Sequence, residues 1–130
     1  DVYKDSRRLL WCLERPLFRD VALTQWATDV RGGERTLEAQ LTFADPFTVP
    51  DDLGEVFLGR GPTPDPERLG AALSLVRTAA SLAPRDTRPA PLTAAAWLSW
   101  ALGRSSHAGQ YLDLVRAIDP EYGLAALLET

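Results

Sequence analysis

The chain has 130 residues and a formal net charge of −4, from 14 basic and 18 acidic side chains. With 45% hydrophobic residues it can bury the core of one domain, and its acidic balance argues against a nucleic-acid-binding module, which requires a basic face. No apolar run approaches the roughly eighteen residues of a membrane-spanning helix, so no membrane partner is predicted.

Three helices are predicted in the first third of the chain, over residues 3–13, 17–30 and 34–44. Pro16 separates the first two, because the residue before a proline avoids helical angles. Gly32 and Gly33 are expected to end the second helix. The side chains expected to point inward are Leu9, Leu10, Leu13, Leu23, Trp26, Ala27, Val30, Leu37, Leu41 and Ala44.

The middle of the chain is predicted to hold a short helical turn over residues 51–57 and an exposed loop over 59–64. A long helix is predicted to follow, with Asp65 as its cap and Pro66 at its first position. Its buried face is expected to comprise Leu69, Ala72, Leu73, Val76, Ala79, Ala80 and Ala83. Residues 84–91, PRDTRPAP, are expected to form a stiff connector.

The next helix, over residues 91–102, is apolar around much of its girth. Ala96 belongs to a face of small residues, which lets another helix come close, and Trp97 belongs to a second apolar face. Such a helix is expected to be buried on two sides. Gly103 then ends it, as a C-terminal glycine does.

A second helix of this hairpin is predicted over residues 106–118, with Ser105 or Ser106 as its cap. Its apolar stripe consists of Ala108, Tyr111, Leu112, Val115 and Ile118. Asp119 and Pro120 are expected to end it and to start a further helix, because a capping side chain precedes a proline at the first helical position.

The succession of helical stripes bounded by proline, glycine and aspartate predicts a compact all-α domain of about six or seven helices. No segment alternates apolar and polar residues beside a hairpin turn, so no sheet of consequence is expected. We expect residues 1–130 to form one helical domain. The sequence contains no methionine, so we also expect it to be the C-terminal fragment of a longer protein.

The hairpin resembles a single tetratricopeptide unit, because Gly103, Ala108, Leu112 and Pro120 stand at offsets typical of that motif. Its first helix departs from the motif: Leu92, Ala95, Ala96 and Ser99 occupy the positions where Trp, Leu, Gly and Tyr are expected. The resemblance covers one unit, which implies a lone hairpin rather than an extended array.

A second resemblance covers more of the chain. Its segments, in order, are RPLFRDVALTQWA, GRGPTPDPERLGAALSLVRTAASLAPR and PLTAAAWLSWALGRSSHAGQYLDLVRAIDPEYGLAALLE. They resemble the C-terminal part of an actinobacterial family, the domain of unknown function 4192. The most specific pieces are the proline-led helix with Trp26 and the run that begins at Asp119 and Pro120. The resemblance implies a helical domain that follows an N-terminal α/β region, and it implies no particular activity.

Few side chains suit catalysis or metal binding. His107 follows two serines, but neighbours on a helix point in different directions, so a surface histidine is expected rather than a base beside its nucleophile. Cys12 is the only cysteine, which precludes an intrachain disulfide and fits a reducing, cytoplasmic setting. Together with His107 it supplies too few soft ligands for zinc. We therefore predict no catalytic site, no cofactor and no metal.

Two further groups of charges have structural interpretations. Arg7, Arg8, Arg15 and Arg19 are expected to form a solvated basic face; the alternatives are that they pair with carboxylates or face the missing N-terminal region. Asp51, Asp52 and Glu55 lack the spacing of a calcium loop and are expected to mark a charged helix start. The glycine turns at 31–33 and 59–61 lack a phosphate-binding pattern, so they are interpreted as breaks between elements.

The prediction for function is a helical protein-interaction or scaffolding domain. The alternative is an accessory domain of an enzyme whose active site lies in a missing N-terminal region. Trp100, Arg104, His107 and Tyr111 are predicted to line a contact face for another protein or for that region, because Trp, Arg and Tyr dominate binding hot spots. The alternative is a purely structural role, in which Trp100 and Tyr111 complete the core and Arg104 is a solvated cation at a helix end. The sequence identifies neither a partner nor an oligomeric state.

Overall fold

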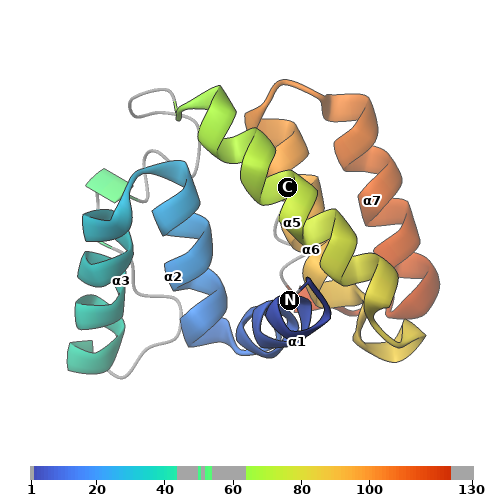
Figure 1. Cartoon of the computed structure of the whole chain (residues 1–130), viewed down its shortest axis with the longest axis horizontal. Coiled ribbons are helices and arrows are strands. Elements are labelled where there is room, and N and C mark those ends of the chain that lie inside the picture. The colour runs from blue at the N-terminus through green and yellow to red at the C-terminus, as the bar shows by residue number, and fades with distance from the viewer. Residues whose placement is uncertain (1, 44–49, 51, 54–63, 124–130) are drawn as a thin grey trace.

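A computed structural model of the chain describes residues 2–43, 50, 52–53 and 64–123 (Figure 1). Its elements are α1 (Val2–Leu13), α2 (Pro16–Ala27), α3 (Val30–Phe43), α5 (Pro66–Leu82), the 3-10 helix η1 (Arg85–Thr87), α6 (Pro89–Ala101) and α7 (Ser105–Ile118). The described residues form a compact all-α fold without strands, which confirms the predicted class. None of the described helices is long and apolar enough to cross a membrane.

Several predicted features lie outside the described residues. They are Ala44, most of the helical turn over 51–57, the loop over 59–63, and all but the beginning of the helix expected after Pro120.

The start of α5 follows its sequence signals closely. The Asp65 carboxylate accepts a hydrogen bond from the Glu67 N–H at 3.0 Å, and Pro66 occupies the first turn. All seven residues predicted for the buried face of this helix are buried. The apolar stripe at helical spacing therefore located both the helix and its inward side.

Residues 84–91 do not form the single connector that was predicted. Arg85–Thr87 is a 3-10 turn, and α6 begins at Pro89. Pro91 therefore lies in the first turn of α6. The N–H groups of the first turn have no partner within a helix, so prolines there break no hydrogen bond. The first hydrogen bond of α6 runs from the Leu92 N–H to the Arg88 carbonyl, at 3.0 Å.

The turn between α6 and α7 is a C-terminal glycine motif, as predicted. Gly103 has a φ of 78°, which favours glycine. Its N–H donates to the Trp100 carbonyl at 2.9 Å, and the Arg104 N–H donates to the Ser99 carbonyl at 2.8 Å. The serine cap was predicted wrongly: α7 begins at Ser105, and the residue at the cap position is Arg104, which makes no side-chain capping hydrogen bond.

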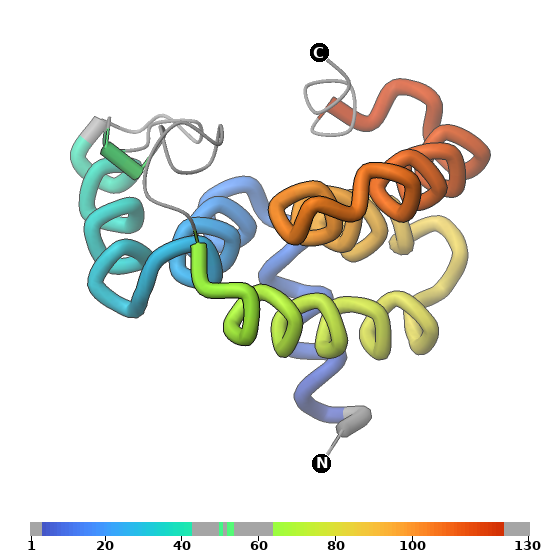
Figure 2. Tube along the Cα trace, turned by 90° about the horizontal axis from the view of Figure 1, so that it is seen from above, coloured from blue at the N-terminus to red at the C-terminus, as the bar shows by residue number. Residues whose placement is uncertain are grey.

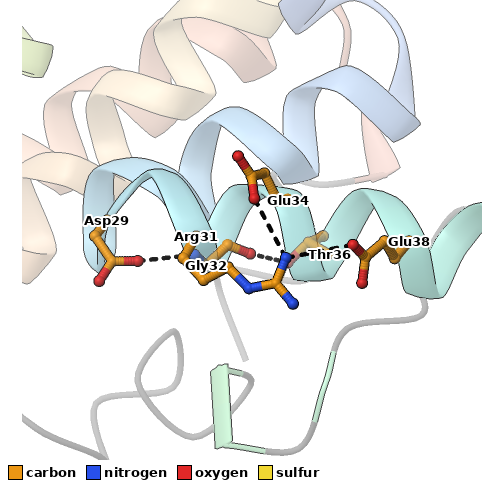
Figure 3. A network of polar contacts seen from close by, with 6 residues as sticks. All are labelled: Asp29, Arg31, Gly32, Glu34, Thr36 and Glu38. Atoms are coloured by element: carbon orange, nitrogen blue, oxygen red, sulfur yellow. Dashed lines mark hydrogen bonds and ion pairs between the residues drawn. The ribbon is translucent and has the colours of Figure 1, made fainter.

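Gly32 and Gly33 do not end α2, as had been predicted; they lie inside α3. The Asp29 carboxylate accepts a hydrogen bond from the Gly32 N–H at 2.8 Å, as a helix cap does (Figure 3). A Cβ on Gly32 would lie 2.0 Å from Thr28 Oγ1, and one on Gly33 would lie 2.8 Å from Gln25 Oε1. Both glycines therefore allow α3 to pack closely against the end of α2.

The inward face of α3 is polar, which corrects a second prediction. Thr36 and Gln40 are buried, whereas Leu41 is 66% exposed and Val30 is 56% exposed. On the solvent side Arg31 forms ion pairs with glutamates one and two turns along the helix (Figure 3). The periodicity therefore located the helix but was wrong for Leu41, while Leu37 is half-buried, because α3 packs on a part of α2 that itself carries charged groups.

The helices form two groups that α1 joins. Figures 1 and 2 both show the α2–α3 pair at one end of the molecule and α6–α7 at the other. α1 contacts α2, α5 and α6, and α6 contacts both α5 and α7. One apolar cluster runs through α1, α2, α5 and α6 and includes Leu13, Leu23, Leu73 and Trp97. A smaller cluster around Val115 joins α7 to α5 and α6.

Candidate functional site

Trp100 occupies an unusual position on α6. Residues 89–99 of this helix are all buried, and Trp97 and Ala96 are almost completely so, as predicted. Trp100 follows directly and is 48% exposed. The helix is covered on its sides by α5 and α7, and Ala101 and Leu102 pack against the main apolar cluster, so Trp100 is the residue of this last turn that faces solvent.

The other three residues of the predicted face lie beyond the Gly103 turn. Arg104 and His107 are exposed, and Tyr111 is half-buried. His107 and Tyr111 are one turn apart on the same side of α7. The Tyr111 ring packs against both apolar clusters. We call these three residues and Trp100 the Trp100 face. The side chains of Trp100 and Tyr111 are both at least partly accessible to solvent.

A groove that the sequence did not indicate runs between α5 and α7. It has a volume of about 580 Å³ and is open to solvent. Its floor is formed by α6, and η1 lies at one end. The described residues that line it are Arg77, Ala80, Ser81, Arg85, Arg88, Leu92, Ala95, Tyr111, Leu114, Ala117 and Ile118. We call it the arginine groove, because three guanidinium groups line it and none of these residues is acidic.

Two of the three arginines are held by backbone carbonyls. Arg85 Nη2 donates to the Ala117 carbonyl at 3.2 Å, near the C-terminal end of α7, and Arg88 Nε donates to the Ala83 carbonyl at 2.8 Å. Each contact uses one of the five N–H groups of a guanidinium. Sequence analysis had assigned these residues to a connector. They converge only because η1 folds the chain back between α5 and α6.

A buried polar cluster joins α2 to α3. Arg19 Nε and Gln40 Nε2 each donate to the Asp20 carboxylate at 3.0 Å. Burial raises the pKa of Asp20 above its ordinary value, while the Arg19 charge and the two hydrogen bonds act in the opposite direction. Of the alternatives predicted for Arg19, a solvated face is wrong, since the residue is buried, whereas pairing with a carboxylate is confirmed. The cluster is covered by the two helices, so it holds the pair together rather than facing a substrate.

Potential metal ligands do not gather among the described residues. No group of three or more His, Cys, Asp or Glu side chains among them is arranged to hold a metal ion. The Asp52 carboxylate accepts two hydrogen bonds from Arg35, at 2.8 and 2.7 Å. This bidentate ion pair connects the middle of α3 to the chain beyond it.

Residues 64–130 match the family described as Domain of unknown function (DUF4192). The match spans just over half of the chain. The chain belongs to this family. No curated protein and no solved structure gives a significant match.

The DUF4192 match contains both surfaces described above. It begins just before α5 and includes η1, α6 and α7, so all residues of the Trp100 face and of the arginine groove lie within it. α1, α2 and α3 lie outside the matched region, including the proline-led helix with Trp26 that also resembled this family. The DUF4192 region thus contributes the smaller apolar cluster and three of the six described α-helices.

Proposed function

We propose that this chain is a helical protein-interaction domain whose contact face is formed by Trp100, Arg104, His107 and Tyr111. The observation that carries the proposal is the 48% exposure of Trp100 beside eleven buried residues of the same helix. Leaving that much indole in water is unfavourable, and binding a partner would remove the cost. Tryptophan, arginine and tyrosine are also the residue types most enriched at binding hot spots.

The partner in this proposal is another protein, or a region that precedes these residues in a longer polypeptide. The hairpin of α6 and α7 gives the face a rigid base, since the Gly103 turn fixes Arg104 relative to Trp100. The groove beside it is open rather than enclosed, which supports interaction over chemistry, because sites for small substrates surround most of the ligand.

The test is a comparison of three baits in an extract of the native host: the wild-type chain, Trp100→Ala and Leu75→Ala. Leu75 is the matched control, since it is an exposed apolar residue (56%) on α5. We expect Trp100→Ala to reduce the amount of one co-purifying protein by about tenfold or more, as loss of a hot-spot residue does. Leu75→Ala should leave it unchanged. Equal recovery of that protein by all three baits would reject the Trp100 face.

A further inference from the structure

We propose that the arginine groove binds an acidic, amphipathic peptide segment of another protein. The proposal begins with charge. The whole chain carries a net charge of −4, yet Arg77, Arg85 and Arg88 line one groove without an acidic residue among its described lining. A cluster of positive charge in a chain whose net charge is negative creates a local electrostatic field that attracts an anionic partner.

The three guanidinium groups that line the groove have N–H donors that are available to a ligand. Arg77 is exposed and makes no hydrogen bond or ion pair to any other described residue. Arg85 and Arg88 are each oriented by one carbonyl contact, which reduces the freedom that binding would have to remove. A guanidinium fork held in this way matches the geometry of a carboxylate, which accepts two parallel hydrogen bonds.

The opposite wall of the groove is apolar. Leu114 on α7 is 52% exposed, and Tyr111 and Ile118 lie one turn away on either side of it. The buried side chains of Leu92 and Ala95 form the floor. A ligand that fills this groove therefore needs carboxylates toward Arg77 on α5 and toward Arg85 and Arg88 at the η1 end, and apolar groups along the edge that faces α7.

The shape of the groove favours a peptide over a small anion. It is open to solvent along the space between two helices, whereas small-molecule sites enclose most of their ligand. An amphipathic helix laid into a groove between helices satisfies both edges at once, with side chains at i, i+4 and i+7 meeting the apolar wall. Tyr111 is the one residue that the groove shares with the Trp100 face; Trp100, Arg104 and His107 do not line the groove, so this inference does not rest on that face.

The probe is a fluorescein-labelled peptide of 14 residues, the length of α7, with glutamates along one side and leucines along the other. Fluorescence anisotropy with the whole chain is expected to give a dissociation constant of about 10–100 µM. Arg77→Gln should weaken binding about five- to tenfold, and Leu114→Gln should weaken it similarly. Both residues are exposed, so the melting temperature checks that the fold is kept.

Two control variants are Arg8→Gln, since Arg8 lines a separate hollow on α1, and Trp100→Ala; both should bind as the wild type does. A peptide with glutamine in place of glutamate should bind about tenfold more weakly or worse. The proposal is overturned if the labelled peptide does not bind at millimolar concentration. It is also overturned if Arg8→Gln weakens binding as much as Arg77→Gln, or if inorganic pyrophosphate binds tightly while the peptide does not.

Discussion

Trp97 and Trp100 lie one turn apart on α6 and provide an internal comparison. Trp97 is 2% exposed and Trp100 is 48% exposed. A fully buried tryptophan removes about 150–250 Å² from water, which at about 25 cal/mol per Å² corresponds to about 4–6 kcal/mol. Because alanine keeps its Cβ and the site relaxes in part, we expect Trp97→Ala to lower the free energy of unfolding by about 3–5 kcal/mol.

The same reasoning gives a much smaller value for Trp100. About half of its surface is already in water, so Trp100→Ala should cost about half as much, about 1.5–2.5 kcal/mol. For a domain of this size each kcal/mol shifts the melting temperature by about 3–5 °C. Trp97→Ala should therefore melt about 9–25 °C lower than the wild type, and Trp100→Ala about 5–12 °C lower.

Differential scanning calorimetry of the wild type and both variants checks this pair of values. A single cooperative transition in each is required for the comparison to hold. If the two variants melted at the same temperature, the orientation assigned to α6 would be wrong. If Trp100→Ala were the more damaging change, its indole would be part of the core and the Trp100 face would not exist.

The remaining predictions concern packing, pH and capping. Gly32→Ala should lower the free energy of unfolding by about 1–3 kcal/mol, because its Cβ would meet the Thr28 side chain. Gly70→Ala should raise it by about 0.5–1 kcal/mol, because that Cβ would meet nothing within 4 Å beyond its chain neighbours and its own helix backbone. Equal melting temperatures of the two variants would contradict this. The folded-state pKa of Asp20 is raised above 3.8, so its stabilising contribution is fully present below pH 3.8 and is lost as the pH rises through the folded-state pKa. In urea titrations the stability of the wild type relative to Asp20→Asn should therefore fall across that window, and a rise would refute the assigned burial. Asp65→Ala should lower stability by about 1 kcal/mol through loss of the α5 cap, and an unchanged urea midpoint would show that the cap contributes nothing.

The second half of the fold could be predicted from the sequence. There the apolar stripes and the signals for helix ends indicate the same helix boundaries. α5 has an aspartate cap, a proline in its first turn and an uninterrupted stripe of small and branched apolar residues. Gly103 stands where the stripe of α6 stops, and its positive φ is the conformation that glycine tolerates best. Each local signal points to the same structure, which is the condition under which sequence patterns are reliable.

The α2–α3 pair could not be predicted in the same way. Which face of α3 is buried depends on its partner, and that partner presents Arg19 and Asp20 rather than apolar side chains. A glycine that permits close packing has the same appearance in a sequence as one that ends a helix. Gly32 was therefore assigned to a break, although Asp29 stands at the spacing of a helix cap and could have indicated the true start of α3.

The candidate surfaces differ in how far the sequence indicated them. Trp100 and Tyr111 were selected because their residue types and spacing suit a contact face. The arginine groove was missed because Arg77, Arg85 and Arg88 belong to three separate segments: α5, η1 and the residue before α6. Arg77 stands eight positions before Arg85, and the side chains of Arg85 and Arg88 are oriented by carbonyls at the ends of two different helices, so the three charges meet only through the fold and no local pattern marks them.

The most direct measurement of the central claim is site-specific photo-crosslinking in the native host. Trp100 is replaced by p-benzoylphenylalanine in one version of the chain and Leu75 in another, two positions with comparable exposure on different helices. If the chain is an interaction domain that uses the Trp100 face, irradiation should produce a discrete crosslinked protein from position 100 and not from position 75. The same products from both positions, or none from position 100, would contradict the proposed function.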